Sequence, residues 1–87
     1  MTGFQVFVVG FEGKTSSIEN VSPGTTVQEL KTKVSDKTGL DAQYIRLIFA
    51  SKELRGDEHP TEDGTRRQWT MADYGIKRDS TLTMITR

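Results

Sequence analysis

The only histidine of this 87-residue chain lies in a segment rich in acidic residues. His59 is accompanied there by the carboxylate side chains of Asp57, Glu58, Glu62 and Asp63. Imidazole and carboxylate groups are common metal ligands and common partners in acid–base catalysis. Both kinds of chemistry need side chains that are held in place, and this segment has no residue able to fill a core. We therefore interpret these residues as part of a solvated charged loop, with no metal site and no catalytic residue.

A second chemical signal is the tripeptide GKT at residues 13–15, which resembles the end of a phosphate-binding loop. The full pattern needs a glycine five positions before Gly13, where Val8 stands instead. No helix is expected directly after the tripeptide to direct backbone amides at a phosphate. The sequence therefore does not favour nucleotide binding, and we expect no cofactor.

Charge and composition exclude several classes of partner. Twelve basic residues balance twelve acidic residues, so the formal net charge is zero and gives no general attraction for nucleic acid or an anionic membrane. The chain has no cysteine, which excludes disulfides and cysteine-ligated zinc. No apolar run approaches the roughly 20 residues that span a bilayer. We therefore expect partners that are neither nucleic acid nor membrane.

Alternating apolar residues predict several β-strands. The strands are expected at residues 4–9, 44–50 and 80–86, with a weaker strand at 14–21 and a short strand at 52–54. In the weaker strand Ile18 and Val21 are three residues apart, which breaks the two-residue period. A β-bulge near Glu19 and Asn20 would return both side chains to the core.

Residues 27–38 are predicted to form the central helix. Thr26 and Glu29 have the spacing of a capping box, in which each side chain satisfies a free backbone amide of the other residue. Apolar residues then recur at helical spacing, at Val27, Leu30 and Val34. Gly39 stands where a helix is expected to end.

Residues 55–68 are predicted to form a long, exposed and mobile loop, because they offer nothing to a core. Trp69 is expected to be partly buried where this loop rejoins the fold. A short helical turn should follow and return Met71, Tyr74 and Ile76 to the core. A hairpin and one helix cannot bury themselves separately, so we predict an α+β fold with a mixed sheet packed on one face around the central helix.

Six segments of the chain occur in the order and near the spacing found in ubiquitin: FQVFV, GKT, TTVQELKTKVSDKTG, RLIFASKEL, DYGI and STLTMITR. The most specific is RLIFA-x-K-x-L. The chain resembles the ubiquitin family over residues 4–87, apart from the long loop and one extra residue in the second strand. The resemblance implies a single ubiquitin-like domain with the β-grasp fold, in which Val9 replaces a family lysine.

The resemblance also implies an exposed apolar patch. In the family it is built from a leucine of the first hairpin, an isoleucine of a middle strand and a valine of the last strand. The corresponding residues here are Phe11, Ile48 and Ile85, surrounded by Arg46, Ser51, Lys52, Thr83 and Arg87. Leu47 would then face the helix, whereas Ile48 would face a protein partner.

Two functions follow from this resemblance. The first is a non-catalytic interaction domain within a larger protein, which docks to ubiquitin-binding helices, ubiquitin receptors or the proteasome. The alternative is a modifier conjugated to targets. Conjugation requires a Gly-Gly tail, which does not occur up to Arg87, so the residues that follow Arg87 in the natural chain would distinguish the two functions. We expect the interaction domain and keep the modifier as the alternative. We further expect a monomer that works in the cytoplasm, the nucleus or both.

Overall fold

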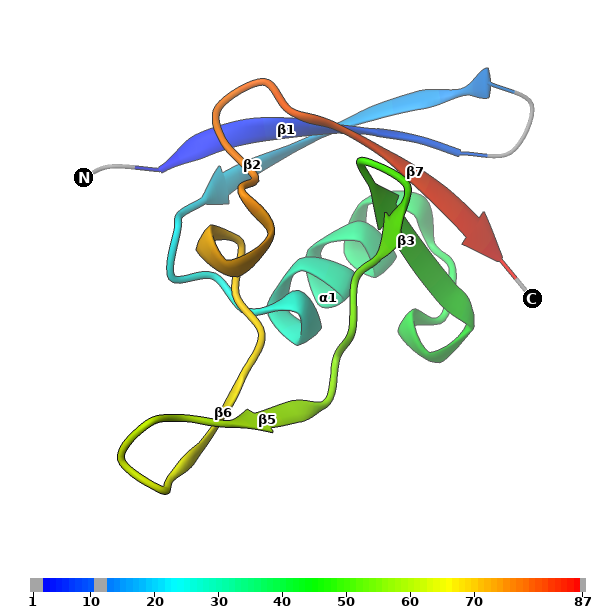
Figure 1. The fold of residues 1–87 in the computed structure, drawn as a ribbon. Helices are drawn as coiled ribbons and strands as arrows, with labels where there is room; N and C mark the ends of the chain where they lie inside the picture. The colour runs from blue at the N-terminus through cyan, green and yellow to red at the C-terminus, as the bar shows by residue number, and fades with distance from the viewer. Residues whose placement is uncertain (1–2, 11–12, 87) are drawn as a thin grey trace.

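The structure is a computed structural model that describes residues 3–10 and 13–86 (Figure 1). The strands are β1 (Phe4–Val9), β2 (Thr15–Val21), β3 (Ile45–Phe49), β4 (Lys52–Glu53), β5 (Glu58–Pro60), β6 (Arg66–Gln68) and β7 (Thr81–Thr86). The α-helix is α1 (Val27–Thr38), and short 3-10 helices are η2 (Ala42–Tyr44) and η3 (Ala72–Tyr74). Among the described residues, no helix is long and apolar enough to cross a membrane.

The main sheet has five strands in the order β2-β1-β7-β3-β4, and α1 lies against one of its faces (Figure 1). The neighbours β1 and β7 run parallel, whereas the other neighbours run antiparallel. This mixed sheet on a central helix is an α+β fold of the β-grasp type, so the predicted fold class is confirmed.

The predicted bulge in β2 is present. Phe4 pairs with Val21 and Val6 pairs with Ile18, so three steps along β2 match two steps along β1. Asn20, inside the bulge, has φ of 60°. Both Ile18 and Val21 are buried as a result, which confirms that the broken period in this strand reflects an extra residue.

The helix α1 has the predicted boundaries and caps. The Thr26 side chain accepts a hydrogen bond from the Glu29 amide, and the Glu29 side chain accepts one from the Thr26 amide. Gly39 follows with φ of 80°, a left-handed conformation that glycine adopts without strain. The apolar stripe of α1 is buried against the sheet, through Val27, Leu30 and Val34.

The core lies between α1 and the inner face of the sheet. Its largest fully buried side chains include Leu30, Ile45, Leu47, Leu54, Met71 and Leu82. As predicted, Met71 and Ile76 return to this core around η3, while Tyr74 and Trp69 are partly buried against it. These contacts hold the chain segment after residue 68 to the body of the fold.

Most of residues 55–68 are exposed, as predicted, but the segment is not a loop throughout. Strands β5 and β6 pair antiparallel and form a small second sheet, which projects from the body of the fold (Figure 1). At the tip, the Thr61 amide donates to the Thr65 carbonyl oxygen at 2.8 Å, and Gly64 has φ of 86°. A short loop with a left-handed glycine is a common hairpin connection. The sequence TEDGT at residues 61–65 therefore indicated a hairpin turn that the sequence analysis did not predict.

Candidate protein-binding site

Four of the predicted patch residues share the face of the sheet that points away from α1. On β3, Ile48 pairs with Thr83 of β7 on one side and with Glu53 of β4 on the other. Ile85 pairs with Arg46 in the same β3–β7 register. Paired residues point to the same face, and diagonal neighbours lie within side-chain reach. Ile48 and Ile85 therefore form one apolar area, flanked by Arg46 and Thr83.

Burial along β3 follows the expected alternation. Leu47 is fully buried, whereas its neighbour Ile48 is only half-buried. On β7, Ile85 is 44% exposed while Met84 is buried. One face of each strand therefore closes the core, and the other face leaves branched aliphatic side chains in contact with solvent.

Val9 extends the apolar area and was not predicted to belong to it. In the parallel β1–β7 register, Val9 pairs with Thr83. Thr83 in turn pairs with Ile48, so the row Val9, Thr83 and Ile48 crosses three strands on one face. The alternation of β1 carried the signal, because Val9 has the opposite parity to the buried residues Val6 and Val8.

The positive charge of Arg46 is balanced within the chain. Its Nε donates to Glu53 Oε2 at 2.8 Å, and its NH2 group donates to Oε1 at 2.5 Å. The hydrogen bond to Glu53 is the main cause that raises the pKa of Arg46, followed by the attraction between the two charges. This bidentate pair lies beside Ile48 and makes that side of the apolar area electrically neutral.

Ser51 and Lys52 are placed differently from the other patch residues. Ala50 and Ser51 have φ of 52° and 66°, so they form the two-residue turn between β3 and β4. Lys52 pairs with Phe49, which puts it on the opposite face of this hairpin from Ile48. The remaining predicted residues, Phe11 and Arg87, lie outside the described residues.

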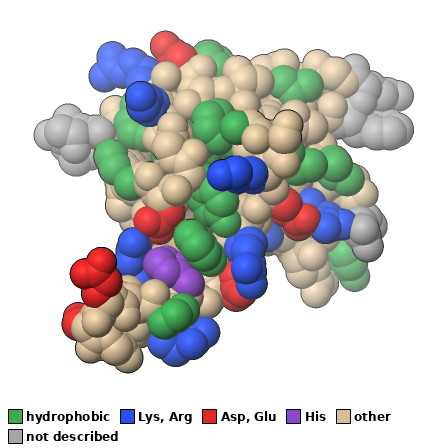
Figure 2. Space-filling view, in the orientation of Figure 1, with side chains coloured by type: hydrophobic (Ala, Val, Ile, Leu, Met, Phe, Trp, Pro, Cys, Tyr) green, Lys and Arg blue, Asp and Glu red, His purple; other side chains and the backbone are tan. Residues whose placement is uncertain are grey.

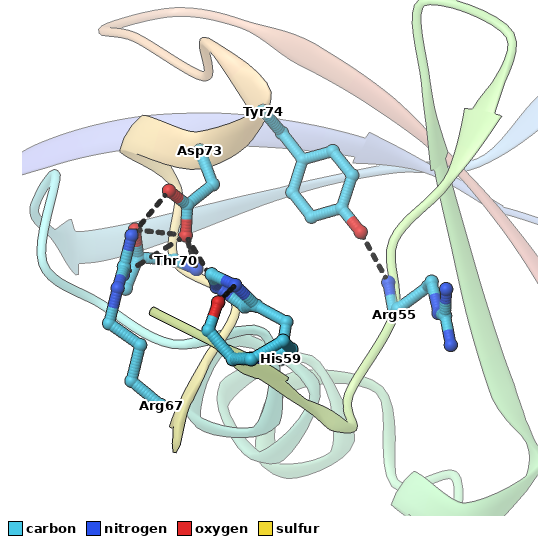
Figure 3. Close-up of polar contacts among 7 residues, drawn as sticks. Arg55, His59, Arg67, Thr70, Asp73 and Tyr74 are labelled. Carbon is cyan, nitrogen blue, oxygen red and sulfur yellow. Dashed lines mark hydrogen bonds and ion pairs between the residues drawn. The ribbon is translucent and has the colours of Figure 1, made fainter. Parts of the chain in front are cut away.

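The interpretation of His59 as part of a solvated loop was wrong. Its side chain is 20% exposed, and its ring stacks on Trp69 with a centroid separation of 4.0 Å. Figure 2 shows the histidine side chain set among hydrophobic and charged groups. His59 Nε2 lies 3.8 Å from Asp73 Oδ2 (Figure 3). The histidine therefore attaches the β5–β6 hairpin to the body of the fold.

Asp73 is the centre of this attachment. Its carboxylate accepts hydrogen bonds from Arg67 NH2 at 2.9 Å and from the Thr70 amide at 2.9 Å (Figure 3). Burial by itself would raise the pKa of Asp73, but the hydrogen bonds from Arg67 and Thr70 outweigh it and lower the pKa overall. A carboxylate stabilised in its ionised form is a poor general acid or base at neutral pH, so this cluster suits a structural role.

The hairpin tip contains another stabilised carboxylate. Asp63 Oδ1 accepts hydrogen bonds from the Thr61 hydroxyl and from the Thr65 hydroxyl and amide. These bonds, that from Thr61 first, lower the pKa of Asp63 to about 2. Within residues 3–10 and 13–86, no group of three or more His, Cys, Asp and Glu side chains is arranged to hold a metal ion.

Comparison with known families agrees with the fold and with this arrangement of the sheet. The model of the ubiquitin family matches residues 6–87, which includes the β5–β6 hairpin. The match extends over most of the chain, and the strand order and the central helix are those that the sequence resemblance implied. This chain therefore belongs to the ubiquitin family.

Proposed function

We propose that this chain is an interaction domain of a larger protein, which docks to ubiquitin receptors or to the proteasome through the sheet face that carries Ile48. Domains of the ubiquitin family are non-catalytic and generally bind other proteins. The observation that carries the proposal is the row formed by Val9, Thr83 and Ile48, with Ile85 beside it. Aliphatic side chains from three strands converge there on a face that α1 leaves uncovered.

The chemistry of this face favours an amphipathic helix as its partner. A flat sheet surface accepts the apolar stripe of a helix, with small or aliphatic residues placed over Ile48. Arg46 is engaged by Glu53, so acidic residues that flank this stripe gain little from it. The interface we propose consists of Ile48, Ile85, Thr83, Arg46 and Val9, with Ser51 and Lys52 at its border and with Phe11 and Arg87 as predicted members.

Such an interface is expected to be weak and reversible. A patch of this size buries less than the roughly 1,200 Å² of a standard protein interface. Weak binding suits a docking module that must release its receptor, in the cytoplasm or the nucleus, where we propose that the chain works as a monomer.

The direct test is the variant Ile48→Ala, titrated with an isolated ubiquitin-binding helix. We expect affinity to fall by at least tenfold, because the helix loses its central apolar contact. Tyr44→Ala is the matched control: Tyr44 is 51% exposed and lies in η2, outside the proposed interface. Equal affinity of Ile48→Ala and the unmodified chain, or equal losses in both variants, would contradict the proposal.

The alternative, a ubiquitin-like modifier, is equally compatible with membership of the family. It requires a Gly-Gly tail beyond Arg87 in the natural product. The two functions are distinguished by incubating the full-length natural product with ubiquitin-like activating enzymes and ATP. A thioester between its C-terminus and the activating enzyme would establish the modifier, whereas no thioester is expected for the interaction domain.

A further inference from the structure

A cleft of about 400 Å³ lies beside the β3–β4 hairpin, which contributes Phe49, Lys52 and Glu53 to its lining. Its walls are aromatic and come from separate parts of the chain: Phe49 at the end of β3, Trp69 after β6, and Tyr74 in η3. Lys52 and Arg55 lie at its border. Clefts of roughly 300–1,000 Å³ with apolar walls and a few polar groups are typical binding sites.

The aromatic walls are held in place before any ligand arrives. Trp69 stacks on His59 with a ring-centroid separation of 4.0 Å, and its ring centroid lies 5.5 Å from that of Tyr74. The Tyr74 hydroxyl accepts a hydrogen bond of 2.9 Å from the Arg55 amide, which joins the two sides of the cleft (Figure 3). A preformed cleft of this kind loses little conformational entropy when it binds a partner.

The charges around the cleft leave one cation available. Arg55 is paired with Asp57 at 2.6 Å, Glu53 is paired with Arg46, and the Asp73 carboxylate is paired with Arg67. Lys52 makes no ion pair or side-chain hydrogen bond with any residue in the described part of the chain. The complementary ligand therefore combines an apolar group for the aromatic walls with a negative charge for Lys52.

We propose that this cleft is a second protein-binding site, which accepts an aromatic side chain of a partner peptide with an Asp or Glu beside it. Aromatic residues seated in pockets supply most of the energy of many interfaces. A carboxylate next to that residue would contact the Lys52 ammonium group and add charge complementarity. The site differs from the proposed Ile48 interface in its aromatic walls, because Phe49, Trp69 and Tyr74 are not members of that interface, whereas Lys52 lies at the border of both.

The probes are three capped pentapeptides: Gly-Asp-Phe-Asp-Gly, Gly-Lys-Phe-Lys-Gly and Gly-Asp-Ala-Asp-Gly. Binding is followed by the ¹H–¹⁵N resonances of the Trp69 indole N–H and of the Lys52 and Arg55 amides. The first peptide is expected to bind saturably, with a dissociation constant of roughly 1 mM. The other two should bind at least fivefold more weakly, because each lacks one of the two complementary groups.

Three variants separate the cleft from the sheet face that carries Ile48. Lys52→Gln should weaken binding of the first peptide about threefold, as expected for an exposed ion pair. Lys77→Gln removes a surface lysine that does not line the cleft and should leave the affinity unchanged. The Ile48→Ala variant should also bind this peptide with unchanged affinity, even though its affinity for the ubiquitin-binding helix falls.

The proposal is overturned by any of three results: equal shifts with all three peptides, no saturable shift, or unchanged affinity of Lys52→Gln. Shifts confined to Ile48, Thr83 and Ile85 would also overturn it, because the peptide would then occupy the other face. The helix titration reports on Ile48 and the peptide titration reports on Trp69. A negative result for one proposed site therefore leaves the test of the other site unaffected.

Discussion

At the scale of single residues, the turn between β3 and β4 stores backbone strain. Ala50 and Ser51 both have positive φ, at 52° and 66°, although neither is glycine. The left-handed conformation costs an L-residue roughly 1–2 kcal/mol, a cost that glycine avoids. The two residues are nevertheless adjacent to the strand that carries Ile48, so this turn fixes the register of the hairpin at the edge of the proposed interface.

Ser51→Gly is therefore expected to stabilise the fold by about 0.5–1 kcal/mol, since the relief of strain exceeds the extra freedom of glycine in the unfolded chain. Equilibrium unfolding in urea measures the change. Ser17→Gly serves as control, because Ser17 lies in β2 paired with Phe7 and should lose stability with glycine. A loss of stability in Ser51→Gly would show that its side chain contributes more than the strain costs.

Substitution by alanine should affect mainly stability at Leu47 and mainly partner binding at Ile48, its neighbour on β3. Leu47 is fully buried, so Leu47→Ala is expected to reduce the free energy of unfolding by about 2–5 kcal/mol. Ile48→Ala removes a half-buried side chain and should cost clearly less stability, while it weakens helix binding at least tenfold. Urea unfolding of both variants tests this division, which fails if Ile48→Ala is the more destabilising of the two.

At the scale of elements, local signals made α1 and the β2 bulge predictable. The helix has a capping box at Thr26 and a stop at Gly39, and the bulge follows from the spacing of Ile18 and Val21. The β5–β6 hairpin lacks such a signal in its strands, because EHP and RRQ show no apolar alternation. Its attachment depends on His59 stacking on Trp69, a contact between residues that the sequence pattern does not relate.

Acidification is expected to release this hairpin before the main sheet unfolds. The lowered pKa of Asp73 means that its stabilising contribution is complete above the unfolded value, near 3.9, and is lost as the pH falls through the folded value. Asp63, with a pKa of about 2, loses its contribution over the same acidic range. Amide hydrogen exchange between about pH 5 and pH 2 should therefore show β5 and β6 losing protection first.

Asp73→Asn provides the control for this experiment. It keeps the size of the side chain but removes the charge that Arg67 and His59 face. The hairpin of this variant should exchange faster already at pH 5 and should show a smaller change on acidification. Simultaneous loss of protection in β5, β6 and the five-stranded sheet would contradict a separate role for Asp73.

At the scale of the whole molecule, the chain presents two different surfaces that both adjoin the β3–β4 hairpin. The sheet face with Ile48 is flat and aliphatic, and its nearest charges are paired through Arg46 and Glu53. The cleft is aromatic and has Lys52 at its border. The resemblance to the family predicted the first surface. The second depends on where the β5–β6 hairpin places Trp69, which follows β6 and lines the cleft.

The orientation of Lys52, a predicted border residue of the Ile48 interface, could not be read from the sequence. Resemblance placed it around Ile48, but the two-residue turn pairs it with Phe49. The pairing register of a hairpin depends on the turn type and loop length as well as on the hydrophobic pattern, and the turn type was not predicted here. The paired state of Arg46 was missed for the same reason, because Glu53 meets it only across the β3–β4 strands.

The central claim is that the sheet face with Ile48 binds a helix of a partner protein, and chemical-shift mapping tests it most directly. A ubiquitin-binding helix is titrated into the ¹⁵N-labelled chain, and perturbed amides are located on the structure. We predict that the largest shifts cluster at Val9, Ile48, Thr83 and Ile85, while β5 and β6 remain unchanged. Shifts confined to α1 or to the β5–β6 hairpin, or no shifts at a millimolar helix concentration, would contradict the claim.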